Sequence, residues 1–330
     1  MTTATLAAYS LLAVYSAAAV YVLAFVGYVV DLSRRSSEAI AAQPMASASL
    51  ATGAGSAGVG GTAGTALLAP PAVPPAGSAA PARSSRVARV AFALTVLGFV
   101  VHVLALVLRG VAAARAPWAN MFEFATTGTA VMVGVYLLVN VFRNVRFLGA
   151  YVTGLVTLLL MLATMNVYVD VVPLPPALQS GWLVIHVFVA ILGTGFYALG
   201  AGLSIAQLLQ ARREAGATGL RFLRGFPSSE ALENLAYRVN VIGFAFWTFT
   251  LIAGAIWAEH AWGRYWGWDT KEVWTFIIWV VFAGYIHARA TRGWRGNPSA
   301  WLAIVGFSAV LFNFTIVNLF FKGLHAYSGL

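Results

Sequence analysis

The chain has 330 residues, of which 60% are hydrophobic and only 9% are charged. A soluble globular domain carries about 25% charged residues, so this composition excludes an ordinary soluble fold and predicts an all-α, polytopic membrane protein. The net charge of +10 would indicate nucleic-acid binding only if the basic residues formed a patch on a soluble face. They lie instead in short loops between apolar segments, so no nucleic-acid partner is expected. The chain has no cysteine, which excludes a disulfide framework and thiol chemistry of its own.

Eight apolar segments are long enough to cross a bilayer, and we expect a transmembrane helix in each of residues 7–30, 87–108, 124–141, 147–169, 182–209, 239–258, 273–290 and 301–321. Basic residues follow the first segment and none precedes it, the reverse of a secretory signal peptide, so residues 1–35 should be a retained N-terminal helix. Residues 36–86 are rich in Ala, Gly, Pro and Ser and should be a disordered cytoplasmic linker. Residues 87–330 should form a seven-helix core.

The basic residues also predict the orientation. With the linker inside, the positive-inside rule places the basic loops near residues 143–146, 212–224 and 289–295 inside as well. The basic residues then left outside are Arg109, Arg115, Arg264, Lys271 and Lys322. We therefore expect a multi-pass protein of the cell (inner or plasma) membrane, with both termini and its active face outside the cytoplasm. Residues 227–230 are expected to cap a short surface helix before the sixth span.

One stretch, residues 257–274, reads WAEHAWGRYWGWDTKEVW and is expected to be an outer loop. Aromatic residues anchor membrane proteins at the interface, and that role alone is one interpretation. Five tryptophans in eighteen residues, mixed with both charge signs and two glycines, exceed what anchoring needs. They suit a flat, aromatic, partly charged ligand, on which rings stack while Arg264 and Lys271 meet its carboxylates.

The histidines are the remaining candidates, because an ionisable residue within a span is functional by default. His186, near the outer end of the fifth span, and His325, just after the eighth, are expected at the level of the tryptophans. Two imidazoles at one depth could ligate a heme iron from both faces; the alternative is a pair of interfacial histidines bonded to loop carbonyls. His287 should lie about 21 Å below the outer end of its span and about 13 Å from His102 in height, so these two are not expected to share a metal. His102 is expected to be a packed histidine, and His260 to pair with polar groups.

The segment WGRYWGWDTKEVW resembles the tryptophan-rich WWD signature of heme-handling proteins in cytochrome c maturation. Similar segments are LQSGW before His186, YIHAR around His287, GLHAYS around His325 and RAPWANMFEF at 115–124. Together they resemble the CcsA/ResC proteins of the System II pathway, called CcsB in some bacteria, over about residues 87–330. The departures are Thr270 in place of the usual proline, Trp118 in place of leucine, and Ala326 in place of serine.

This resemblance implies that His186 and His325 ligate the iron of heme b, carried as a bound substrate. It also implies a heme-binding role for the residues of the Trp-rich stretch, namely Trp262, Arg264, Trp266, Trp268, Asp269, Lys271 and Trp274. His287 would be a transmembrane heme ligand whose opposite ligand comes from a partner subunit of the CcsB or ResB type.

The implied function is to move heme to the outer face and to present it for thioether attachment to the CxxCH segment of apocytochrome c. The chain would thus be the heme-handling subunit of a holocytochrome c synthase whose activity requires the partner, with thiol-reducing proteins as indirect partners. A System I protein of the CcmC or CcmF type shares the Trp motif, but GLHAYS and eight spans favour System II. A heme exporter or a heme-binding electron-transfer subunit without ligation activity is the alternative from another class. Transporters usually contain repeats or broken helices, and a cytochrome b usually pairs its own intramembrane histidines.

Overall fold

The computed structural model describes the chain except for residues 1, 42–84, 175–177, 292–293, 322 and 326–330. The described residues form no strand, and eight of their helices are long and apolar enough to cross a membrane. The helices are α1 (Thr3–Ala41), α3 (Arg86–Ala113), α4 (Met121–Phe142), α5 (Gly149–Asn166), α6 (Gly181–Glu214), α7 (Ser229–Trp262), α8 (Thr270–Ala290) and α9 (Asn297–Phe312). The last span continues through a π-helical turn, Asn313–Val317, into α10 (Asn318–Phe320). The predicted all-α polytopic fold is confirmed.

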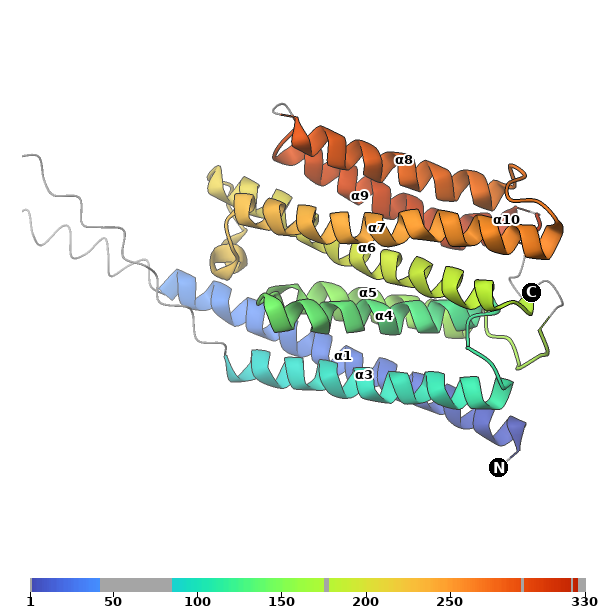
Figure 1. The fold of residues 1–330 in the computed structure, drawn as a ribbon. Coiled ribbons are helices and arrows are strands. Elements are labelled where there is room, and N and C mark those ends of the chain that lie inside the picture. The colour runs from blue at the N-terminus through green and yellow to red at the C-terminus, as the bar shows by residue number, and fades with distance from the viewer. Residues whose placement is uncertain (1, 42–84, 175–177, 292–293, 322, 326–330) are drawn as a thin grey trace, which may run out of the picture.

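The helices stack in pairs across the bundle (Figure 1). Helix α1 packs on α3 and α5, α4 packs on α5 and α6, α6 packs on α7 and α9, and α8 packs on α9 and α7. Helices α3 and α8 therefore lie on opposite sides of the bundle. His102 is on α3 and His287 is on α8, so this chain does not bring those two histidines together.

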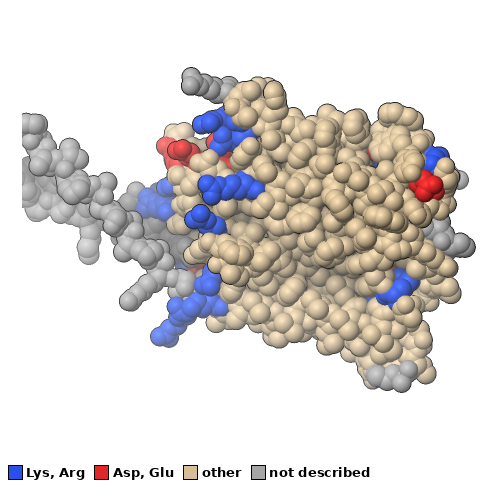
Figure 2. Space-filling model, viewed as in Figure 1, with Lys and Arg blue, Asp and Glu red and all other residues tan. Residues whose placement is uncertain are grey.

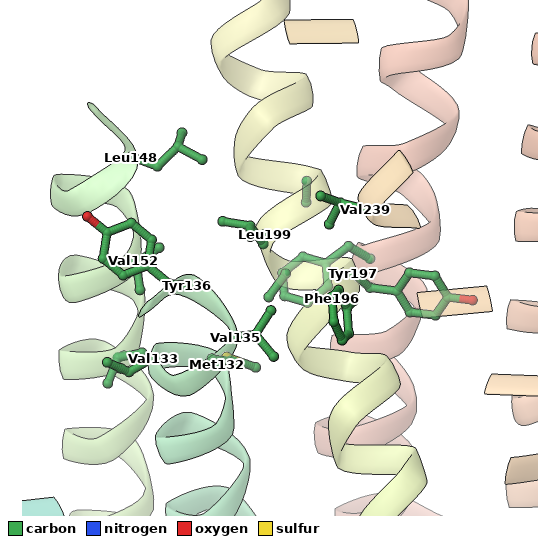
Figure 3. Close-up of a cluster of buried hydrophobic side chains, with 14 of the residues drawn as sticks. Met132, Val133, Val135, Tyr136, Leu148, Val152, Phe196, Tyr197, Leu199 and Val239 are labelled. Atoms are coloured by element: carbon green, nitrogen blue, oxygen red, sulfur yellow. The ribbon is translucent and has the colours of Figure 1, made fainter. Parts of the chain in front are cut away.

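The core lies between the central helices (Figure 3). Val133 and Tyr136 of α4, Val152 of α5 and Tyr197 of α6 are buried there. Tyr197 also stacks on Phe282 of α8, with ring centres 3.5 Å apart. Large apolar side chains also point outward along the spans, including Leu12, Val100, Leu158 and Val305, as expected of helices whose outer faces meet lipid.

The Trp-rich stretch is shorter as a loop than the sequence suggests. Helix α7 runs to Trp262 and ends at Gly263, whose φ of 69° lies in the left-handed region that favours glycine. Helix α8 begins after Asp269, which caps it in a capping box completed by Glu272. Only residues 263–269 therefore form the connection, and three of the five tryptophans of residues 257–274 are helical.

Two other boundaries differ from the prediction. Ser228 caps a helix as expected, but that helix is α7 itself and not a separate surface helix. The sequence from Ser229 onward contains no glycine or proline before Gly243, so nothing interrupts the helix. Helix α1 extends to Ala41, into the predicted linker 36–86, most of which lies outside the described residues.

Basic side chains gather at one end of the bundle (Figure 2). The start of α1 and the α7–α8 connection lie at the other end (Figure 1). His325, close to the C-terminus of the chain, contacts Asp269 of this connection. The start of α1 and His325 are thus on one side of the bundle, and the predicted orientation of both termini stays a prediction.

Candidate functional site

A cavity of about 490 Å³ opens at the end of the bundle that carries the α7–α8 connection. This volume is within the range of small-molecule sites, about 300–1,000 Å³. Helices α4 to α9, the α7–α8 connection and His325 line it. We call it the end cavity. Its polar lining includes two of the predicted ligands, His186 and His325, together with Lys271.

His186 reaches the end cavity from the second turn of α6, which Ser180 caps. Its Nδ1 lies 3.0 Å from the carbonyl oxygen of Thr250 on α7. A carbonyl only accepts hydrogen bonds, so Nδ1 carries the proton and donates, and the lone pair is on Nε2. Gly254 permits this arrangement, because a Cβ there would lie 2.7 Å from the imidazole. The tautomer is the one that a metal-ligating histidine requires.

His325 is held in an equivalent way by a carboxylate. Its Nδ1 lies 3.2 Å from Oδ1 of Asp269. The same oxygen accepts from the amide of Lys271 at 2.7 Å, and Oδ2 accepts from the amide of Leu324 at 2.8 Å. Gly323 is in contact with this carboxylate, where a Cβ would collide. Partial burial by itself raises the pKa of Asp269, but the hydrogen bond and charge of His325 and the two amides outweigh it and hold that pKa well below its ordinary value. Asp269 therefore stays ionised and directs Nε2 of His325 away from itself.

One buried indole contacts both histidines. Trp257, only 2% exposed, stacks on His186 with ring centres 5.8 Å apart and meets His325 edge-on at 5.5 Å. Trp262 also meets His325 edge-on, at 4.7 Å. Trp257 was not among the predicted site residues. The signal was present, since Thr250, Gly254 and Trp257 have the i, i+4, i+7 spacing of one helix face.

The other predicted tryptophans occupy different places. Trp266 lines the end cavity and also, with Trp268 and Phe276, a second hollow of about 390 Å³ on the bundle surface. Trp268 is 72% exposed, and its φ of 60° is unusual for a bulky residue. Trp274 packs against Phe312 of α9 at 4.4 Å. Of the tryptophans predicted as ligand contacts, Trp266 is thus the one that forms a wall of the end cavity.

The two predicted cations, Lys271 and Arg264, lie in different places. Lys271 lines the end cavity, where its Nζ donates to the carbonyl oxygen of Asn313 at 2.9 Å and to Oδ1 of Asn318 at 2.7 Å. An ammonium has three donors, so one remains for a ligand. Asn313 begins the π-helical turn, a feature that is frequent at functional sites. Arg264 is not among the described residues that line the end cavity; its guanidinium lies over Gly267, with Nη1 3.9 Å from Glu272 Oε1.

The remaining histidines lie apart from the end cavity. His287 is exposed in the last turn of α8, at the opposite end of that helix. His102 is fully buried, with Nδ1 3.5 Å from the hydroxyl of Tyr21, and is packed as expected. His260 is half-exposed, bonds to the carbonyl of Ile256 within its own helix, and lies 3.3 Å from a carboxylate oxygen of Glu259.

Fold and site together define a multi-pass helical membrane protein whose end cavity presents two oriented imidazoles beside tryptophans. Residues 91–325 match the family model of cytochrome C assembly proteins. The chain is 35% identical over 257 residues to the cytochrome c biogenesis protein CcsA of Guillardia theta, covering 72% of this chain and 84% of that protein. It is 40% identical over 176 residues to CcsA of Synechococcus sp. (strain CC9902), covering 47% of this chain and 58% of that protein.

The chain belongs to the cytochrome c assembly protein family, and its function is in cytochrome c maturation, as the resemblance predicted. Its similarity to CcsA proteins confirms the System II assignment. The solved structure of cytochrome c heme lyase CcmF has a similar fold, with a TM-score of 0.61 at 16% identity over 95% of this chain and 47% of CcmF. The chain spans about half the length of CcmF, which represents the more distant System I alternative.

Proposed function

We propose that the end cavity holds heme b as a bound substrate and presents it to apocytochrome c. The observation that carries the proposal is the matched pair of histidines. His186 and His325 each donate Nδ1–H to a fixed oxygen, which leaves Nε2 available, and both line one cavity beside the same indole. Two imidazoles in this state are the axial ligands that a heme iron takes.

The surrounding side chains have complementary roles. Trp266 contacts the face or edge of the porphyrin, and Lys271 neutralises a propionate. Asp269 fixes the tautomer and the orientation of His325. The histidine of the CxxCH segment replaces one axial ligand, and each cysteine thiol then adds across a heme vinyl group, which forms the thioether bond without a further reactant. The chain contributes position and orientation to this step.

His287 belongs to a second, transmembrane heme site. It is exposed on α8, and the nearby Gly284 has open space where a side chain would be. An exposed imidazole on a spanning helix needs a partner at the same depth, and we assign that partner to a histidine of a CcsB- or ResB-type subunit. The chain is then the heme-handling subunit of a System II synthase in the cell membrane. Heme enters from the cytoplasmic side and reaches an end cavity outside the cytoplasm.

The test uses the full chain produced with its partner subunit and a reporter apocytochrome that carries one CxxCH segment. His186→Ala and His325→Ala should each abolish covalent heme in the reporter, and added imidazole should partly restore it by entering the vacated position. His260→Ala is the matched control, since His260 bonds within its own helix. Full reporter assembly by both variants would refute the assignment. Heme binding in the end cavity without any thioether formation would make the chain a carrier and not part of a synthase.

A further inference from the structure

The end cavity contains a buried hydrogen-bond donor that the fold itself does not use. Asn120 lines the cavity and is 7% exposed. Its Oδ1 caps α4 by accepting from the amide of Glu123 at 2.9 Å. Its Nδ2 is buried and has no hydrogen-bond partner among the described residues. Buried polar atoms are nearly always paired, so this amide in the cavity wall is free to donate to an acceptor on a ligand.

The segment before Asn120 is held by a buried carboxylate. Glu123, fully buried, accepts from Arg109 Nε at 3.1 Å, from Arg115 Nη1 at 2.6 Å and from the amide of Ala119 at 3.0 Å. Two arginines and a backbone amide on one carboxylate fix the loop that leads into α4. The backbone that carries Asn120 is thus fixed before any ligand arrives.

The neighbouring wall of the end cavity carries a cation. Phe124, one turn after Asn120, stacks on Phe314 of the π-helical turn with ring centres 4.9 Å apart. The adjacent residue in that turn, Asn313, holds Nζ of Lys271 through its carbonyl oxygen. The amide of Asn120 and the ammonium of Lys271 therefore lie on two walls of the end cavity that meet where Phe124 stacks on Phe314. Donors of this kind favour an anionic acceptor with several lone pairs, such as a carboxylate.

We propose that Asn120 is a substrate-binding residue, whose Nδ2 donates a hydrogen bond to a propionate carboxylate of the heme in the end cavity. The proposal rests on the proposed function, because it assigns the acceptor to that substrate. With Lys271, Asn120 selects the edge of the porphyrin that faces α4 and α9. The vinyl groups, which lie away from the propionates on the ring, are then left for the attacking thiols.

Capping alone does not account for an amide at this position, because serine and aspartate cap helices as well as asparagine does. This equivalence provides the test. Asn120→Ser keeps a capping oxygen but ends one bond short of the Nδ2 position, so its hydroxyl does not take the place of the amide donor, whereas Asn120→Asp keeps the shape and the cap but presents a carboxylate to the substrate. Both variants of the full chain, purified in detergent, are titrated with hemin and with hemin dimethyl ester, whose propionates carry no charge.

We expect Asn120→Ser to weaken hemin binding roughly tenfold, the effect of one hydrogen bond to a charged group, and Asn120→Asp to weaken it more. Binding of the dimethyl ester should change much less in both variants. Ser228→Ala is the control, since it removes the cap of α7 at the far end of the bundle and should affect neither porphyrin.

Equal losses for the two porphyrins would overturn the proposal and make Asn120 a purely structural cap. Unchanged hemin binding in both variants would overturn it as well. Failure of the proposed function has a separate signature, because the unaltered chain would then show no six-coordinate heme spectrum with either porphyrin.

Discussion

The contact between Asp269 and His325 offers the sharpest test of the end cavity. We consider Asp269→Asn, which removes the charge but keeps the shape of the side chain. Asparagine is an equally good helix cap, so α8 should still begin at the same residue. The amide has one acceptor oxygen in place of two, whereas the carboxylate accepts from His325, Lys271 and Leu324. The oxygen that caps α8 occupies the Oδ1 position, so the bond from Leu324 to Oδ2 is lost and the bond from His325 changes from a charged acceptor to a neutral one.

The expected magnitude follows from the contact that is most affected. A hydrogen bond to a charged group contributes about 1.5–3 kcal/mol, and the Asp269 side chain is only 5% exposed, so solvent screens it little. In Asp269→Asn the imidazole of His325 bonds to a neutral oxygen in place of a charged one, so its orientation is held less firmly. Replacing a partner of a metal-ligating histidine lowers metal affinity about 10- to 100-fold, which agrees with that energy.

The assay is a hemin titration of the full chain in detergent, followed by absorbance, with the position of the Soret band as a measure of axial ligation. Asp269→Asn should bind hemin about 10- to 100-fold more weakly and show a larger five-coordinate fraction. Asp170→Asn is the control, because Asp170 is exposed and contacts Tyr168 outside the end cavity. A hemin affinity within twofold of the unaltered chain, with an unchanged spectrum, would show that Asp269 does not orient a heme ligand.

Two further predictions concern stability. The pKa of Asp269 is lower in the folded protein than the ordinary value of about 3.9. The ionised carboxylate therefore stabilises the fold fully above about pH 4, and this stabilisation is lost as the pH falls further. In thermal unfolding in detergent, the midpoint should fall less between pH 5 and pH 3 for Asp269→Asn than for the unaltered chain. At the other end of the bundle, Glu233 and Arg289 form a buried ion pair at 2.8 Å, and Ser299 also contacts Glu233. Glu233→Gln leaves a buried guanidinium without its counter-charge and should lower the free energy of unfolding by about 3–5 kcal/mol. The thermal midpoint should fall accordingly. An unchanged midpoint would show that the pair contributes nothing to stability.

The spans were predictable because a helix that crosses lipid must be apolar along its length, and this shows in the hydropathy of the sequence. Their ends were not, because a helix does not stop where the lipid stops. Residues 239–258 were predicted for the sixth span, and the helix runs from Ser229 to Trp262. The added turns contain Glu230, Glu233 and Asn234, which are polar and yet compatible with a helix. Only the cap at Ser228 marks the true start.

The candidate site was predictable where one residue type carries the signal, and not where contacts join distant segments. His186 and His325 were assigned to one level from the ends of their spans, and both line the end cavity. Trp268 and Trp274 belong to the same motif, but a single sequence does not show which way a tryptophan faces. Asn120 was not singled out, because its buried Nδ2 becomes visible only after α4 packs against its neighbours.

The sequence indicated both Arg264 and Lys271 as contacts for the carboxylates of the substrate, and two variants distinguish between them. Gly267→Ala would place a Cβ where the Arg264 guanidinium lies and displace it. Arg264 is partly exposed, 3.9 Å from Glu272, and such a pair contributes about 0–1 kcal/mol. Gly267→Ala should therefore leave hemin affinity within about twofold. Lys271→Met keeps the side-chain length but removes the ammonium that Asn313 and Asn318 hold in the end cavity, and should weaken hemin binding tenfold or more with little effect on hemin dimethyl ester. If Gly267→Ala caused the larger loss, Arg264 and not Lys271 would be the propionate contact.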